Sequence, residues 1–272
     1  MDFFGNCIKT IECDGNRQLV MSCFDAICVL INGCSGFIKQ NLSFYGETLE
    51  RLGNIVINAF KNKLFCQTVT QDDDGEDPMK LDDLDENQAE YDYMIKEYAG
   101  DLVPALALCL PDETFDKYFE KVLQFLHRIL NKSDSTIAEK SFVIGVIGET
   151  VCNMNSLNQQ KATIIYKGYK SSAHLKTTDS FSFLGLQHYM IDSDDEVRSN
   201  TIFTVGVLCS QSNGALKAEY ENIIKDLLII LNNEKNKQVF DNICGTLCRI
   251  CFSGVFLNVP NVDYGMVCKT KL

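Results

Sequence analysis

The sequence lacks an excess of basic residues. It holds 25 Lys and Arg against 37 Asp and Glu, which gives a formal net charge of −12. Phosphates repel a chain this acidic, so the composition argues against direct nucleic-acid binding and favours basic partners. No segment reaches about 18 uncharged apolar residues, which argues against insertion in a membrane. The opening residues Met1-Asp2-Phe3-Phe4 are not the basic start of a signal peptide.

The sequence also lacks motifs that would indicate catalysis or a cofactor. Its three histidines, His127, His174 and His188, share no motif, and we interpret His127, beside Arg128, as a surface or rim residue. It contains no Gly-rich phosphate loop, no Ser/His/Asp arrangement and no nucleophile elbow. We therefore expect no enzymatic activity, no catalytic residues and no cofactor.

Cysteine, in contrast, is abundant, with 13 residues. The number is odd and the cysteines lie inside apolar runs, unlike the framework of a secreted disulfide-bonded protein. We interpret them as reduced thiols of a cytosolic or nuclear protein. Cys244, Cys248 and Cys251 follow the spacing i, i+4, i+7 and could begin a zinc site, but no fourth ligand stands nearby. We favour core packing along one helical stripe and expect no metal site.

Apolar residues recur at helical spacing along most of the chain, whereas strand signals are nearly absent. Segments 44–62, 113–131 and 217–233 have the pattern of amphipathic helices. Three further stretches begin with a polar residue that can cap a helix and continue with apolar residues at helical spacing; they start at Asp134, Asp194 and Asn236. A weaker copy starts at Asn16.

The copy at Asp194 is preceded and followed by other acids, in the stretch DSDDEVRSN (192–200). This patch is either a metal or catalytic site or the start of a helix. The copies at Asp134 and Asn236 lack most of these acids, so we favour the helix start. Asp194 is then an N-cap, and Asp195 and Glu196 are first-turn charges that suit the helix dipole.

The capped starts at 134, 194 and 236 lie 60 and then 42 residues apart. The second spacing matches a HEAT or armadillo repeat of about 40–47 residues. The first needs an extra loop or short helix, for which segment 158–179 is polar and irregular enough. We predict an all-α fold, an α-solenoid of HEAT repeats in which antiparallel helix pairs stack into a superhelix. The expected organisation is HEAT repeats at 1–70 and 93–252, an acidic loop at 71–92 and an irregular tail at 253–272.

The segment 71–92 interrupts the helical rhythm with eleven acids and one base, Lys80. Such a run repels itself and resists folding, and we expect a helix to resume near Tyr91. Two interpretations remain open. The segment is either a solvated loop that keeps the chain soluble or an electrostatic attractor for a Lys/Arg-rich partner.

Four blocks resemble, in order, the C-terminal half of nuclear import receptors of the importin-β (karyopherin-β) family. They are AEYDYMIKEYAGDLVPALA (89–107), AEKSFVIGVIGETV (138–151), DSDDEVRSNTIFTVGVLC (192–209) and DNICGTLCRI (241–250). The resemblance covers about residues 10–250. Residues 153–180 match poorly, and the helical period is lost after Ile250.

The resemblance implies a receptor that binds basic protein cargo, such as histones or ribosomal proteins, and shuttles between cytoplasm and nucleus. It also implies contacts with nucleoporins and release of cargo by the Ran GTPase, through N-terminal repeats that this chain lacks. The family's cargo surface is carried over to these acids: Asp72, Asp73, Asp74, Glu76, Asp77, Asp82, Asp83, Asp85, Glu86, Asp194, Asp195, Glu196 and Asp241. The alternatives are a general HEAT-repeat scaffold without transport activity and a truncated chain with no function of its own.

Overall fold

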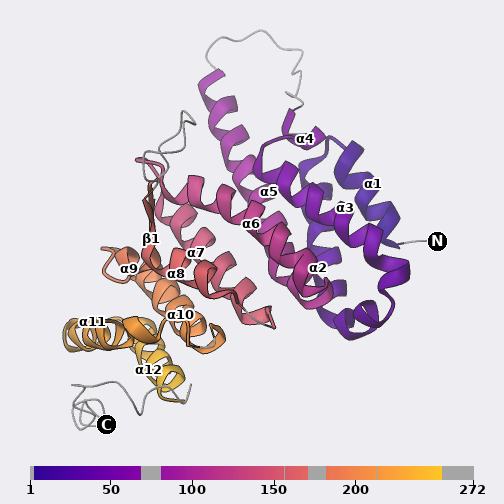
Figure 1. Cartoon of the computed structure of the whole chain (residues 1–272). Coiled ribbons are helices and arrows are strands. Elements are labelled where there is room, and N and C mark those ends of the chain that lie inside the picture. Colours follow the sequence, from indigo (N-terminus) through magenta and orange to yellow (C-terminus); the bar gives the residue numbers. More distant parts are fainter. Residues whose placement is uncertain (1–2, 69–80, 156, 171–181, 213, 253–272) are drawn as a thin grey trace. The chain divides into compact units, whose positions relative to one another are not determined.

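The structure is a computed structural model that describes residues 3–68, 81–155, 157–170, 182–212 and 214–252 (Figure 1). The chain divides into two compact units, residues 1–125 and 126–272. The boundary falls inside helix α6 (Asp112–Leu130).

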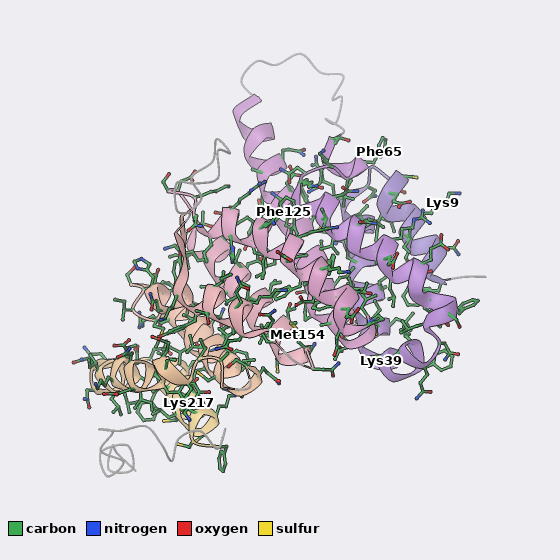
Figure 2. All side chains as sticks on the ribbon, viewed as in Figure 1. Lys9, Lys39, Phe65, Phe125, Met154 and Lys217 are labelled. Atoms are coloured by element: carbon green, nitrogen blue, oxygen red, sulfur yellow. The ribbon has the colours of Figure 1, made fainter. Side chains whose placement is uncertain are left out.

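The first unit is built from helices packed against their neighbours. They are α1 (Phe3–Cys13), α2 (Arg17–Gln40), α3 (Leu42–Phe60), the short α4 (Phe65–Thr68), α5 (Leu81–Cys109) and the first part of α6. Helix α2 packs against α1 and α5, and α3 packs against α5. At the end of α3, the Lys61 ammonium lies over the ring of Phe125 on α6, 5.2 Å from the ring centroid. Figure 2 labels Phe125. Residues at helical spacing form the core, and burial of each large apolar side chain contributes roughly 1.5–3 kcal/mol.

Helix α2 is long and apolar enough to cross a membrane by length and composition, with a hydropathy of 1.6. Its side chains Phe24, Ile27 and Ile31 are fully buried in the core of the first unit. A core helix of a folded domain passes the same test, so this single helix is weak evidence for a membrane span.

The second unit contains a stack of three long helices. They are α7 (Ile137–Asn153), α10 (Asp195–Gln211) and α12 (Lys237–Phe252), and α10 packs against both of the others. Helices α8 (Gln159–Lys167) and α9 (Leu186–Tyr189) pack against α10, and α11 (Tyr220–Asn233) packs against α12. A layer of shorter helices thus accompanies the stack. The described residues confirm the predicted all-α fold of HEAT-repeat type, with helices packed in neighbouring pairs.

One hairpin departs from the helical pattern. Strands β1 (Gly168–Lys170) and β2 (Ser182–Leu184) pair antiparallel, with Gly168 opposite Leu184. Helix α8 and β1 therefore occupy most of the described part of the segment that was expected to hold a loop or short helix. Gly185, directly after β2, is required sterically, because an added Cβ would lie 2.2 Å from the Tyr166 carbonyl oxygen.

Two predicted helix starts are wrong. Helix α7 is capped by Thr136 rather than Asp134, because Thr136 and Glu139 form a capping box in which each side chain bonds the other's backbone N–H. Helix α5 begins at Leu81, about ten residues before the expected start near Tyr91. Acids in a first helical turn interact favourably with the helix dipole, so the acidic composition there does not prevent a helix.

Candidate functional site

The acidic patch at 192–200 is a helix start, as predicted. The Asp194 carboxylate accepts hydrogen bonds from the backbone N–H groups of Glu196 (3.0 Å) and Val197 (3.1 Å). Asn236 caps α12 in the same way, accepting from Gln238 (2.9 Å) and Val239 (3.2 Å). These caps each stabilise the fold by about 1 kcal/mol.

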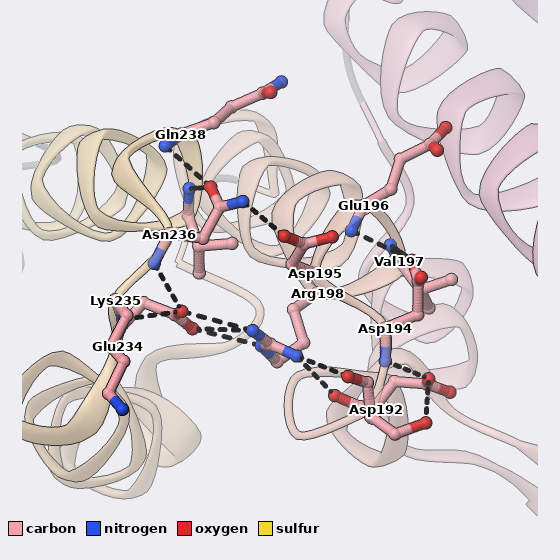
Figure 3. Close-up of polar contacts among 12 residues, drawn as sticks. Asp192, Asp194, Asp195, Glu196, Val197, Arg198, Glu234, Lys235, Asn236 and Gln238 are labelled. Atoms are coloured by element: carbon pink, nitrogen blue, oxygen red, sulfur yellow. Dashed lines mark hydrogen bonds and ion pairs between the residues drawn. The ribbon is translucent and has the colours of Figure 1, made fainter.

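Arg198 connects this helix start to the next repeat (Figure 3). Its Nε and Nη2 atoms donate to the Glu234 carboxylate at 3.1 and 3.2 Å, and Nη1 donates to the Asp192 and Ser193 carbonyls at 2.9 and 3.0 Å. Burial opposes ionisation of Glu234, but backbone N–H groups of Asn236 and Lys235 and the Arg198 guanidinium hold its pKa below the ordinary value. The Glu234 side chain is only 7% exposed. Removal of Arg198 would leave the Glu234 carboxylate with its backbone N–H partners but without this cation, at a cost on the order of 1–3 kcal/mol.

The remaining acids of the patch connect α10 to α7 and α12. Asp192 forms an ion pair with Lys140 of α7 at 3.1 Å. Burial opposes ionisation of Asp192, but hydrogen bonds from the Asp194 backbone and from Lys140 keep its pKa below the ordinary value. The Ser141 hydroxyl of α7 donates to Glu196 at 2.6 Å, and Asn236 donates to Asp195. The patch therefore joins three consecutive repeats.

A second set of polar contacts runs between the stacked helices. Asn200 of α10 donates to the Ser141 hydroxyl of α7 at 2.7 Å, and Thr204 donates to the Ile144 carbonyl at 3.2 Å. The contact also requires Gly148, because an added Cβ would lie 2.3 Å from the Thr204 hydroxyl oxygen.

The same contacts recur one repeat later. Asn242 of α12 donates to the Ser199 hydroxyl of α10 at 2.9 Å, and Thr246 donates to the Ile202 carbonyl at 2.8 Å. Gly206 takes the place of Gly148, with an added Cβ 2.4 Å from the Thr246 hydroxyl oxygen. We call this repeated arrangement the interhelix ladder.

The interhelix ladder was not predicted, although the sequence contains a signal for it. In each contact we call the helix that comes later in the chain the arriving helix and the earlier one the receiving helix. Counted from its N-cap, the arriving helix has Asn at the sixth position and Thr at the tenth. These are residues 200 and 204 of α10 and residues 242 and 246 of α12. The receiving helix has Ser at the fifth position after its N-cap and Gly at the twelfth. These are residues 141 and 148 of α7 and residues 199 and 206 of α10. The signal becomes visible once Thr136 is known to cap α7.

Two interpretations of single residues are corrected by the structure. Cys244, Cys248 and Cys251 lie on the exposed side of α12, so their expected packing in the core is wrong. Within the described residues, no group of three or more His, Cys, Asp or Glu side chains is placed to hold a metal ion. His127 is half-buried rather than a surface residue, with Nε2 inaccessible to solvent. Burial lowers its pKa to about 4.

The predicted cargo-binding acids fall into four groups. Asp72, Asp73, Asp74, Glu76 and Asp77 lie outside the described residues, and Asp82, Asp83, Asp85 and Glu86 lie in the first turns of α5, where side chains are not described. Asp194, Asp195 and Glu196 come together at the start of α10 and bond to the protein itself. Asp241 is exposed on α12. Cargo binding by all of these residues stays a prediction.

The repeated helix pairs, the capped starts and the contacts between repeats define a HEAT-repeat protein. No protein-family model matches the chain. It is 29% identical to importin-4 of Homo sapiens and 27% identical to importin-4 of Mus musculus, each over 243 residues, which is 89% of this chain and 20% of the relative. It is 26% identical over 179 residues, 66% of this chain and 15% of the relative, to the probable importin subunit beta-4 of Schizosaccharomyces pombe.

These similarities agree with the resemblance drawn from the four sequence blocks: the chain is similar to proteins of the importin-β family along most of its length. All three relatives are named as importins and none is named for an enzymatic activity. The chain spans about a fifth of the length of the importin-4 proteins it matches.

Proposed function

We propose that this chain is part of a nuclear import receptor that binds basic protein cargo, such as histones or ribosomal proteins. In this proposal the receptor shuttles between cytoplasm and nucleus, contacts nucleoporins and releases its cargo when the Ran GTPase binds. The observation that carries the proposal is the similarity to importin-4 along 89% of the chain. The net charge of −12 also supports a basic ligand, because opposite charges accelerate encounter.

The internal bonds of the α10 start are compatible with this role. Asp195 and Glu196 are exposed despite their bonds to Asn236 and Ser141. An ionised carboxylate has about four lone-pair sites, so each can accept a further bond from a lysine or arginine without losing its present one. We therefore propose that these acids have two uses, one in joining repeats and one in binding cargo.

The proposal is tested by titrating a labelled Lys/Arg-rich histone-tail peptide against the chain by fluorescence anisotropy. We expect binding that weakens strongly between about 50 and 200 mM salt, because added salt screens exposed charges. A variant in which Asp72, Asp73, Asp74 and Glu76 are replaced by Asn or Gln should bind several-fold more weakly. A matched control neutralises four exposed acids elsewhere: Glu47, Glu50, Glu113 and Glu120.

A general HEAT-repeat scaffold is the alternative, favoured by the use of the acidic patch in joining repeats. A scaffold that holds partners through apolar contacts predicts little salt dependence. If the peptide does not bind, or if both neutralised variants lose the same affinity, the acids at 72–76 have no specific role and the cargo proposal fails in this form.

A further inference from the structure

We propose that Cys7 and Cys23 are a reversible oxidation site, at which a hydroperoxide converts the two thiols into a disulfide that joins helix α1 to helix α2. Both residues belong to the first unit. Neither takes part in the acidic patch or the interhelix ladder of the second unit, so this site is independent of the proposed import function.

The two cysteines lie on the buried sides of neighbouring helices. Helices α1 and α2 pack against each other. Cys7 of α1 is 9% exposed, and Ile11, one turn later, is fully buried. Cys23 of α2 is half-buried, and Val20 and Ile27, one turn before and after it, are fully buried. Each thiol therefore stands in the apolar stripe of its helix.

The two thiols are in direct contact across the helix pair. A side-chain hydrogen bond joins the Cys7 and Cys23 thiols. Two cysteines can be bridged without backbone movement only where their side chains point toward each other, and hydrogen-bonded thiols meet that condition. Two thiols on separate helices are thus placed to form one bond between α1 and α2.

The two thiols differ in exposure and in ease of ionisation. Cys23 is the more exposed, so a peroxide in solution reaches it first. Burial, and then the adjacent Cys23 thiol, raise the pKa of Cys7 to about 11. Cys7 therefore keeps its proton at neutral pH and does not attack a peroxide, since the thiolate is the nucleophile. Cys23 is thus the peroxide-reactive thiol and Cys7 the resolving thiol.

The reaction with hydrogen peroxide takes two steps. The Cys23 thiolate attacks one peroxide oxygen, the O–O bond breaks and the leaving hydroxide takes up a proton to become water, which leaves a sulfenic acid at Cys23. Cys7 then loses its proton and attacks the Cys23 sulfur, so that the S–O bond breaks, the S–S bond forms and a second water leaves. Two thiols are oxidised and one peroxide is reduced. A thiol such as glutathione reverses the modification by exchange.

The disulfide would hold α1 on the rest of the first unit. Helix α1 has 11 residues and packs against α2, α3 and α4. It also forms an ion pair between Glu12 and Arg51 of α3, whose side chains are 32% and 53% exposed. An exposed ion pair contributes little, so apolar packing is the main barrier to local opening of α1. A covalent link to α2 should suppress this opening.

The first test treats the full chain with hydrogen peroxide, blocks the remaining thiols with iodoacetamide and maps disulfides by mass spectrometry of a digest with trypsin and chymotrypsin. We expect a peptide linking Cys7 to Cys23, at least tenfold more abundant than any other linked pair, and dithiothreitol should remove it. Cys28→Ala is the matched control, because Cys28 is also a half-buried cysteine of α2 but donates to the Asp101 carbonyl at 3.4 Å. It should leave the link unchanged.

A second test separates the two roles. In Cys7→Ala, the sulfenic acid at Cys23 has no resolving thiol, so dimedone should label Cys23 at least fivefold more than in the wild type. In Cys23→Ala, the same peroxide treatment should leave Cys7 unlabelled. Far-UV circular dichroism establishes that each variant keeps its helices, and the disulfide map of the wild type needs no substitution.

Hydrogen exchange measured by mass spectrometry tests the consequence for α1. After oxidation, amides of α1 should exchange at least tenfold more slowly, amides of α12 should exchange as before, and dithiothreitol should restore the faster rate. Absence of the Cys7–Cys23 peptide, an equal amount of a Cys7–Cys28 peptide, dimedone labelling of Cys7 in place of Cys23, or unchanged exchange in α1 would each overturn the proposal.

Discussion

At the scale of single residues, local chemistry determines what the sequence reveals. Asp194 and Asn236 were identified correctly as N-caps because a cap bonds only to the next few residues. The cap predicted at Asp134 was wrong because Thr136 precedes the same apolar run and forms a reciprocal bond with Glu139. The burial of His127 was not predicted, since the spacing of residues along a helix does not show which side chains other elements cover.

The burial of His127 predicts a pH dependence of stability. Its pKa is about 4 in the folded chain and about 6.5 in an unfolded one. Between these values the unfolded state binds a proton that the folded state does not, so the free energy of unfolding should fall as the pH is lowered from about 6.5 to 4. Above pH 6.5 this residue contributes no pH dependence.

The measurement is urea unfolding of the wild type and of His127→Gln at a series of pH values. The carboxylates titrate in both proteins and cancel in the difference. The wild type should lose stability relative to the variant across this window. A difference that stays constant with pH would show that the imidazole is accessible to protons in the folded chain.

At the scale of helices, periodicity predicts which residues share a stripe but not which element covers that stripe. The apolar spacing located α6 and α11 within a few residues, since an amphipathic pattern is local. The thiols Cys244 and Cys248 follow the same pattern and are nevertheless exposed, because no described helix packs over them. The interhelix ladder likewise depends on the register between helices, which one sequence does not show directly.

The ladder predicts that Gly206→Ala destabilises the chain by roughly 1–3 kcal/mol through overpacking, despite the better helix propensity of alanine. The added Cβ would lie 2.4 Å from the Thr246 hydroxyl oxygen. Urea unfolding measures the change. Gly36→Ala is the matched control, because no atom outside its own helix lies within 4 Å of the added Cβ. It should leave stability unchanged or raise it by up to about 1 kcal/mol.

A double-mutant cycle identifies the cause. Thr246→Ala removes the hydroxyl that an alanine at 206 would meet, so the double variant should be more stable than the two separate effects predict. Additive effects would show that Gly206 is required for a reason other than its contact with Thr246.

At the scale of the whole molecule, repeats contact mainly their neighbours, so stability in such arrays is approximately local. The chain's two units each have a buried core, with Leu52 fully buried in the first and Val205 in the second. The fold class could be predicted because each repeat carries its own capping residue and apolar face. The division between the two units could not be predicted, since it falls inside α6 and no sequence feature marks it.

If stability is local, a destabilising substitution in one unit should speed amide exchange in that unit and not in the other. Hydrogen exchange measured by mass spectrometry tests this. Gly206→Ala should speed amide exchange in α7, α10 and α12, which the ladder connects, while exchange in α1 and α2 stays as in the wild type. Leu52→Ala, which leaves a cavity costing about 2–5 kcal/mol, should produce the reverse pattern. If either variant accelerates exchange equally in both units, the chain unfolds as one cooperative body and the two units are not independent in stability.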